Sequence, residues 1–162
     1  MNIAHIGWLA SSHIQRRAEA LRQKGINTLV FTDSIPPGYD WRAKGLTVEV
    51  LPKKNHPQAR ISWLKQRLAA RKVDLLHIHS THFPASLGFF CQDTPRITSI
   101  WDFVFSRDTV SPLFHKIILD ELFRGTISEY VSFSSPVVMD QWLKRGFPKK
   151  RAFWHSWGVD IE

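Results

Sequence analysis

Apolar positions along the chain follow two patterns. Short, nearly continuous apolar runs predict buried β-strands at residues 3–7, 27–32, 46–51, 75–79, 96–101, 130–133 and 152–154. Between these runs, apolar residues recur every three or four positions, which predicts helices near residues 12–24, 61–71 and 83–91, and two more that begin after Ser111 and Ser135. The chain therefore alternates strands with helices along its whole length.

Local signals mark several helix ends. Ser12 followed by Gln15 predicts a capping box at the first helix, and Gly25 predicts its left-handed stop. Ser111-Pro112 and Ser135-Pro136 each combine an N-cap serine with a proline at the first helical position.

Strands that alternate with crossover helices pair in parallel, and the helices then cover both faces of the sheet. We expect an α/β fold with a doubly wound, mostly parallel, Rossmann-like sheet of about seven strands. Ligands of such sheets bind beyond the carboxyl ends of the strands, near the point where the strand order reverses. The loops after the first, fourth and fifth strands are therefore the candidate sites.

Composition narrows the class of protein. The 162 residues, 43% of them hydrophobic, are enough for a single domain over residues 1–162 and exclude a disordered or collagen-like chain. Lys and Arg number 22 against 14 Asp and Glu, a formal charge of +8, so the surface should attract anions. The single cysteine, Cys91, excludes an intrachain disulfide and favours a reducing compartment. With no apolar run of membrane-spanning length, we expect a soluble cytoplasmic protein.

The loop after the first strand holds one group of candidate binding residues: Gly7, Trp8, Ser11, Ser12 and His13. It lacks the glycine fingerprints of dinucleotide-binding folds and of P-loops, which argues against an oxidoreductase or a P-loop enzyme. A helix N-terminus beside two serines can still hold a phosphate or a sugar hydroxyl. The alternative is that Ser12 serves only as a helix cap.

Histidines mark the end of the fourth strand. His77 and His79 share one strand face and His82 follows, which raises the hypothesis of a metal site. No cysteine or carboxylate accompanies them in sequence, so we expect no metal and no cofactor. We interpret His77 as an interior residue, and His79, Ser80 and His82 as candidate substrate contacts.

The fifth strand ends at Trp101-Asp102. A carboxylate at the carboxyl edge of a central strand can orient or deprotonate a hydroxyl, so Asp102 is the candidate catalytic base and Trp101 a candidate substrate contact. The alternative is that Asp102 only caps a helix or loop.

Basic and aromatic residues interleave in three segments, residues 41–44, 63–67 and 144–151. Such patches suit nucleic acid or an anionic membrane surface. A run of charge on a helix is usually only its solvated face, so we expect no nucleic-acid partner. An anionic membrane surface at the inner face of the membrane is the candidate partner, because the helix near residues 61–72 carries aromatic and cationic side chains together.

Five segments, in this order and spacing, together resemble the N-terminal half of a family 4 glycosyltransferase of the GT-B architecture. Residues 1–7 are similar to its opening strand and residues 18–30 to its "ALxxxGHxVxV" segment. Residues 72–79 match "PDxxHxH", residues 132–151 resemble "VSxxxxxxLxxxGxPxxR", and Gly158-Val159-Asp160 resembles "NGVD".

The resemblance implies transfer of a sugar from a nucleotide-sugar donor to a glycan or lipid-linked acceptor, as in polysaccharide biosynthesis. It implies that this half binds the acceptor, that an absent C-terminal domain binds most of the donor, and that the isolated chain is inactive. Three departures leave the sugar open. Residues 8–12 stand where the family usually has glycines in the first loop, Trp101 stands where it commonly has a histidine, and Trp157 replaces the asparagine before Gly158. The alternative function is a non-catalytic α/β module for ligand binding or protein interaction.

Overall fold

The computed structural model describes residues 1–53, 56–81, 83–100 and 112–154. Within them, seven strands form one sheet. Their bounds are β1 (Asn2–Ile6), β2 (Asn27–Thr32), β3 (Thr47–Val50), β4 (Leu75–His79), β5 (Arg96–Ile100), β6 (Tyr130–Phe133) and β7 (Ala152–Trp154).

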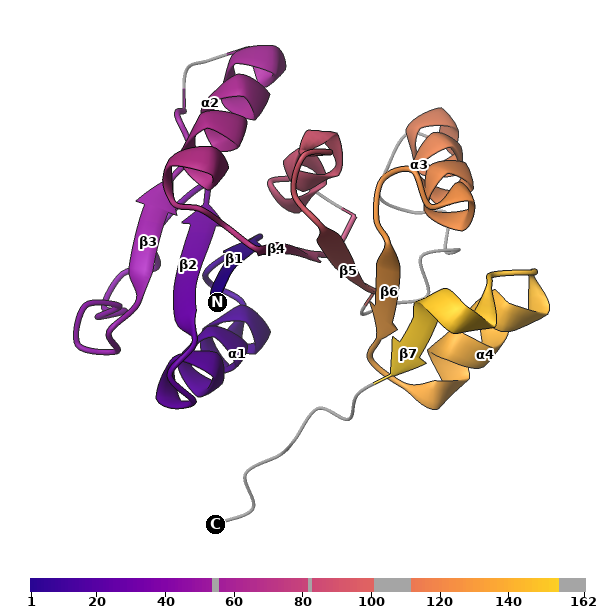
Figure 1. Cartoon of the computed structure of the whole chain (residues 1–162), viewed down its shortest axis with the longest axis horizontal. Coiled ribbons are helices and arrows are strands. Elements are labelled where there is room, and N and C mark those ends of the chain that lie inside the picture. Colours follow the sequence, from indigo (N-terminus) through magenta and orange to yellow (C-terminus); the bar gives the residue numbers. More distant parts are fainter. Residues whose placement is uncertain (54–55, 82, 101–111, 155–162) are drawn as a thin grey trace.

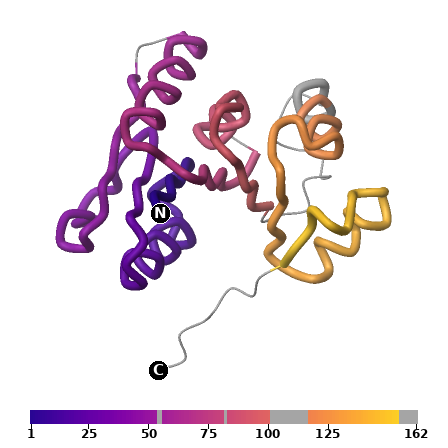
Figure 2. The backbone as a smooth tube through the Cα atoms, viewed as in Figure 1, coloured from indigo at the N-terminus to yellow at the C-terminus, as the bar shows by residue number. Residues whose placement is uncertain are grey.

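Every strand pair is parallel, and the order across the sheet is β3-β2-β1-β4-β5-β6-β7. The order reverses between β1 and β4, which makes the ends of these two strands the switch point of the sheet. Figure 2 shows the consequence: the first part of the chain lies on one side of β4 and the last part on the other. The predicted Rossmann-like α/β fold is confirmed.

Helices cover the two faces of the sheet (Figure 1). Helix α1 (Ser12–Gln23) lies on one face, while α2 (Pro57–Ala70), the 3-10 helix η1 (Ala85–Phe90) and α3 (Pro112–Arg124) lie on the other. Helix α4 (Pro136–Lys144) lies beside β7 at the end of the sheet, and the short η2 (Lys149–Arg151) leads into that strand.

The alternation of side chains along each strand decides what each face buries. The apolar residues of the main core point towards α2, η1 and α3, and they include Ile6, Phe31, Ile78 and Phe133. The face towards α1 is divided. A smaller apolar cluster that includes Ile14, Ala18 and Val30 fills one part, and polar side chains of β1, β4, β5 and β6 fill the other. A buried polar strip of this kind needs hydrogen-bond partners, and it marks the region of interest.

Two local predictions differ from the structure. The segment near residues 83–91 forms the 3-10 helix η1 rather than an α-helix. A Cβ on Gly88 would lie 2.8 Å from Ile78 Cγ1 and 3.1 Å from Ile6 Cγ2, so η1 rests directly on β1 and β4. Close tertiary packing therefore overrides the helical pattern here.

The predicted capping box is also wrong. The N-cap of α1 is Ser11, its side chain makes no capping hydrogen bond, and Ser12 is the first helical residue. Gln15 does not reach back to a cap; its Nε2 donates to the Leu9 carbonyl at 2.6 Å, which ties the helix to the preceding loop. At α4 the prediction holds, because Ser135 Oγ accepts a hydrogen bond from the Val138 backbone N–H. Gly25 adopts the predicted positive φ, at 77°.

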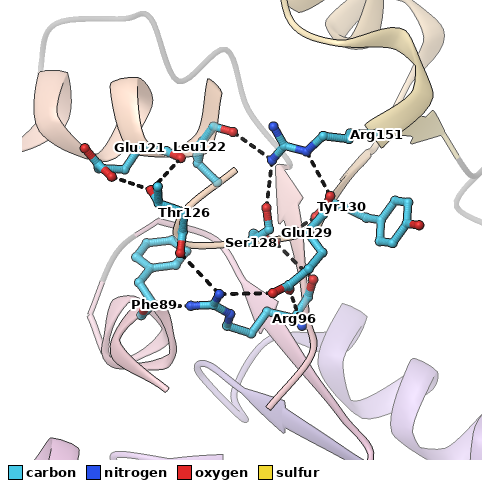
Figure 3. A network of polar contacts seen from close by, with 9 residues as sticks. All are labelled: Phe89, Arg96, Glu121, Leu122, Thr126, Ser128, Glu129, Tyr130 and Arg151. Carbon is cyan, nitrogen blue, oxygen red and sulfur yellow. Dashed lines mark hydrogen bonds and ion pairs between the residues drawn. The ribbon is translucent and has the colours of Figure 1, made fainter. Parts of the chain in front are cut away.

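Two arginines, Arg96 and Arg151, bind several backbone carbonyls at the edge of the sheet where β5 and β6 begin, opposite the edge where β1 and β4 end (Figure 3). Arg96, buried at 4% exposure, donates to the carbonyls of Phe89 and Thr126 and pairs with Glu129 at 3.0 Å. Arg151 donates to four carbonyls, those of Leu122, Phe123, Ser128 and Glu129, at 2.7 to 3.0 Å. Because two of these carbonyls end α3, the cation also meets the negative end of that helix dipole. We call Arg96 and Arg151 the arginine clamp, because their hydrogen bonds hold η1, the end of α3 and the segment before β6 together.

Candidate functional site

The candidate site lies at the carboxyl edge of β1 and β4, where the first loop leaves the sheet. Gly7 is held in line with the sheet by a 3.1 Å hydrogen bond from its N–H to the Phe31 carbonyl. A Cβ there would meet Ile14 Cδ1 at 2.6 Å and His79 Cβ at 3.0 Å. The loop therefore lies against the end of β4, and a side chain at position 7 would displace Ile14 and crowd His79.

The rest of the loop separates a buried anchor from an exposed rim. Leu9 is fully buried, and its N–H donates to Thr32 Oγ1 at 3.1 Å. Trp8 leaves 58% of its surface exposed beside this anchor. The Trp8 ring is thus a large, exposed apolar group at the rim, next to a turn in which the Ser11 N–H donates to the Trp8 carbonyl at 2.9 Å.

The N-terminus of α1 adds polar groups to this rim. Ser11 is half-buried, and Ser12 and His13 are exposed. Desolvation, followed by the charges of Arg17 and Arg16, lowers the pKa of His13 below its usual 6.5. His13 is therefore neutral at pH 7 and can donate or accept a hydrogen bond without adding charge.

The end of β4 continues the site. Ser80 has a positive φ of 86°, which is rare for a residue with a side chain. Its N–H donates to the Ser99 carbonyl at 3.0 Å, so the sheet holds this backbone in place. A residue held in such a conformation costs on the order of 1–3 kcal/mol and is typical of functional sites.

Beneath the rim, three histidine rings gather on the face that α1 covers. His5 of β1 is the register partner of His77 of β4, and His79 lies two residues further on the same face. His5 Nδ1 lies 2.8 Å from His79 Nε2, and the rings of His77 and His79 stack at 4.0 Å. All three side chains are buried, at 0%, 8% and 2% exposure in chain order.

Burial keeps the imidazole of His5, one of the three rings, in its neutral form. Desolvation, with a smaller contribution from the charge of Arg17, lowers the pKa of His5 from 6.5 to about 3. Arg17 Nη1 of α1 lies 3.1 Å from His77 Nε2 and donates to Ser99 Oγ at 3.2 Å. Ser99 Oγ lies 2.7 Å from His77 Nε2 and donates to Ser132 Oγ at 3.4 Å. Polar contacts thus link Arg17 through His77 and Ser99 to Ser132, and the stacked rings of His77 and His79 join this chain of contacts to His5.

The structure brings together most of the residues named from sequence. Gly7, Trp8, the start of α1, His79 and Ser80 all lie around the ends of β1 and β4. His77 is an interior residue, as expected, and His79 is also buried. His82, Trp101 and Asp102 lie outside the described residues. Sequence reasoning missed His5, Arg17 and Ser99. His5 could have been found from its place in the first apolar run, because that run forms β1, the strand next to the one that carries His77.

The basic segments are largely tied to other parts of the fold. Arg67 of α2 and Arg71, the C-cap residue of that helix, both pair with Glu49 of β3, at 2.5 and 2.8 Å. The hydrogen bond from Arg67 is the main cause that lowers the pKa of Glu49. Trp63 packs edge-on against Phe31 and is only half-exposed. Along α2, Lys65 is exposed and available to an anionic surface. No helix among the described residues has the length and apolar character needed to cross a bilayer.

No protein-family model and no curated protein matches the chain. Solved structures do. A structure of HepE from Anabaena in complex with UDP-glucose superposes with a TM-score of 0.75 at 15% identity, over 99% of this chain and 45% of that one. A glycosyltransferase from Rickettsia africae gives 0.73 at 15% identity, over 98% and 43%. A sucrose-phosphate synthase structure from Thermosynechococcus elongatus gives 0.71 at 15% identity, over 99% and 91%.

At these identities the likeness establishes the fold. The chain spans less than half the length of the HepE and Rickettsia proteins and nearly all of the sucrose-phosphate synthase chain. It is therefore similar to part of the longer HepE and Rickettsia proteins, and the Rickettsia protein is a glycosyltransferase by name.

Proposed function

We propose that this chain is the acceptor-binding half of a glycosyltransferase that moves a sugar from a nucleotide-sugar donor to a glycan or lipid-linked acceptor. The observation that carries the proposal is the site at the ends of β1 and β4 within a fold shared, over nearly the whole chain, with a named glycosyltransferase and with a protein crystallised with UDP-glucose. The motif resemblance to family 4 glycosyltransferases supports the same function independently.

The geometry of the rim supports acceptor binding. Trp8 offers an exposed aromatic face, on which the apolar face of a sugar ring can stack. Ser11, Ser12 and His13 add hydroxyl and neutral imidazole groups beside it, and such groups hydrogen-bond sugar hydroxyls. In the proposal Gly7 keeps the loop close to the sheet, and His79 and Ser80 shape the end of β4.

The proposed reaction also uses residues that follow β4 and β5 in sequence. Asp102, which follows β5, acts as general base towards the acceptor hydroxyl, and Trp101 after β5 and His82 after β4 contact substrate. A donor-binding α/β domain completes the active site, because the reacting atoms must be held between two surfaces to gain the benefit of proximity. The isolated chain is inactive in this proposal.

A cytoplasmic position next to an anionic membrane surface is part of the proposal for a lipid-linked acceptor. The formal charge of +8 supports it, since polybasic proteins are attracted to anionic lipid headgroups. Arg67 and Arg71 pair with Glu49 and Arg60 donates to the Lys53 carbonyl, so the exposed Lys65 is the cation of α2 chosen for the test. Lys65→Glu should weaken binding to anionic vesicles and leave binding to neutral vesicles unchanged.

The test on the chain itself is a chemical-shift map. Backbone amides and the Trp8 indole are followed while simple glycans and polyprenyl-phosphate sugars are titrated in. The proposal expects saturable shifts in residues 7–13 and at Ser80 with at least one acceptor class. It also expects no turnover of nucleotide sugars by the chain alone. Shifts confined to α2 and α4, or sugar transfer by the isolated chain, would overturn the assignment of this domain to the acceptor.

A further inference from the structure

The buried histidines His5, His77 and His79 bring three possible metal-binding nitrogens together in the interior. His5, His77 and His79 each place one ring nitrogen so that the three atoms all lie within 4.8 Å of one another. They come from adjacent parallel strands whose register fixes them on one face. The ring nitrogens that face one another are His5 Nδ1 and His79 Nε2, which lie 2.8 Å apart. Burying three imidazole rings costs free energy that apolar side chains in the same places would not cost.

We propose that His5, His77 and His79 form a binding site for one divalent transition-metal ion of the Zn²⁺ class. This inference is independent of the proposed sugar transfer. Imidazole nitrogens suit Zn²⁺, and three of them leave a fourth position for another ligand. Metal binding also requires neutral imidazole, and the interior keeps His5 in that form at pH 7.

The geometry needs a small adjustment to accept the ion. Ligands about 2.0–2.1 Å from a tetrahedral Zn²⁺ stand about 3.3 Å from one another. His5 Nδ1 and His79 Nε2 are 2.8 Å apart, so these two rings separate by roughly half an ångström. Ser99 Oγ, 2.7 Å from His77 Nε2, can orient the His77 ring so that Nδ1 is its ligating atom.

Arg17 opposes the ion and makes a sharp prediction. Its Nη1 lies 3.1 Å from His77 Nε2, so a bound divalent cation repels the guanidinium. Arg17 sits on α1 and is only half-buried, which lets the side chain turn outward. Removing this charge with Arg17→Met should therefore tighten Zn²⁺ binding.

The location gives the metal a structural task. The His79 Cβ lies 3.0 Å from the place where a Cβ on Gly7 would stand, so the cluster is directly under the first loop. An ion held by β1 and β4 fixes the two strands on either side of the switch point. Binding to the folded state alone also raises stability by mass action.

The experiment is a titration of the tag-free chain with Zn²⁺ at pH 7, followed by calorimetry and thermal unfolding. The proposal expects one Zn²⁺ per chain, a rise in Tm, and no effect of Mg²⁺, which prefers oxygen ligands. His5→Phe should weaken binding at least about tenfold, the scale of one lost contribution to a metal site. The exposed His56 supplies the control, and His56→Ala should bind as the original chain does.

A spectroscopic readout keeps the test decisive if His5→Phe does not fold. Imidazole ¹⁵N spectra of the unmodified chain should show Zn²⁺ shifting three histidines together, with the same stoichiometry as the calorimetry. Co²⁺ should give the visible absorption of a tetrahedral site. Binding that His56→Ala removes, shifts confined to exposed histidines, or no Zn²⁺ binding up to about 100 μM would overturn the proposal. So would an Arg17→Met variant that binds Zn²⁺ more weakly.

Discussion

The buried His5 predicts that the free energy of unfolding falls as the pH falls from 7 to 4.5. In the folded chain its pKa is about 3, against 6.5 in an unfolded chain. Between these values the unfolded state binds a proton that the folded state does not, so acid favours unfolding. At 1.36 kcal/mol per pKa unit, the two units between 6.5 and 4.5 amount to about 3 kcal/mol. The stability that depends on a neutral His5 is fully present above pH 6.5 and is lost as the pH falls below that value.

Other groups around His5 need to be separated from it. His77 and His79 face it from β4, and Arg17 faces it from α1. The lowered pKa of Glu49 also costs stability in acid, but only as the pH falls below about 4.5, its usual value. Measurements between pH 7 and 4.5 therefore exclude most of the Glu49 contribution.

The assay is urea unfolding at five pH values in this range, with a chelator present, for the original chain and for His5→Gln. The glutamine keeps a polar side chain and removes the titration. The original chain should lose about 3 kcal/mol more than the variant between pH 7 and 4.5. His56→Gln, which changes an exposed histidine, should lose as much as the original chain. Equal losses in the original chain and His5→Gln, or a His5 ring that titrates near 6.5 by NMR, would refute the reasoning.

Three further predictions concern single residues. Gly7→Ala should lower the free energy of unfolding by about 1–3 kcal/mol in urea, because its Cβ overlaps Ile14 and crowds His79; an unchanged midpoint would contradict the close approach. Arg151→Gln should cost about 3 kcal/mol by removing charged hydrogen bonds to four carbonyls, and a loss below about 1 kcal/mol would contradict the arginine clamp. In the complete glycosyltransferase that we propose, Asp102→Asn should lower the transfer rate by about 10²-fold or more with little change in Tm; near-normal turnover would mean that Asp102 only caps.

The strands could be predicted because burial on both faces leaves a direct trace in the sequence. Residues 75–79 are apolar except for two histidines, and the structure has β4 there. The alternation of strands and helices then limits the topology to a parallel sheet. The same argument predicted candidate sites in the loops after the first, fourth and fifth strands, and the observed strand order puts the switch point between β1 and β4.

Contacts between distant segments left no comparable trace. His5 joins His77 and His79 only through the register of two strands that lie about 70 residues apart in sequence. Gln15 has the spacing of a capping box, yet it bonds the Leu9 carbonyl because the loop passes within reach. The 3-10 geometry of η1 likewise depends on the surface formed by Ile6 and Ile78. Tertiary packing decides each of these cases.

The most direct test of the proposed function is sugar transfer by the complete protein encoded by the reading frame that contains these 162 residues. The purified protein is incubated with a panel of labelled nucleotide sugars and with glycan and lipid-linked acceptors, and labelled product is counted. The proposal predicts transfer with at least one donor and acceptor pair, and its loss in a protein that lacks the residues outside this chain. A folded complete protein that transfers no sugar from any donor would contradict it.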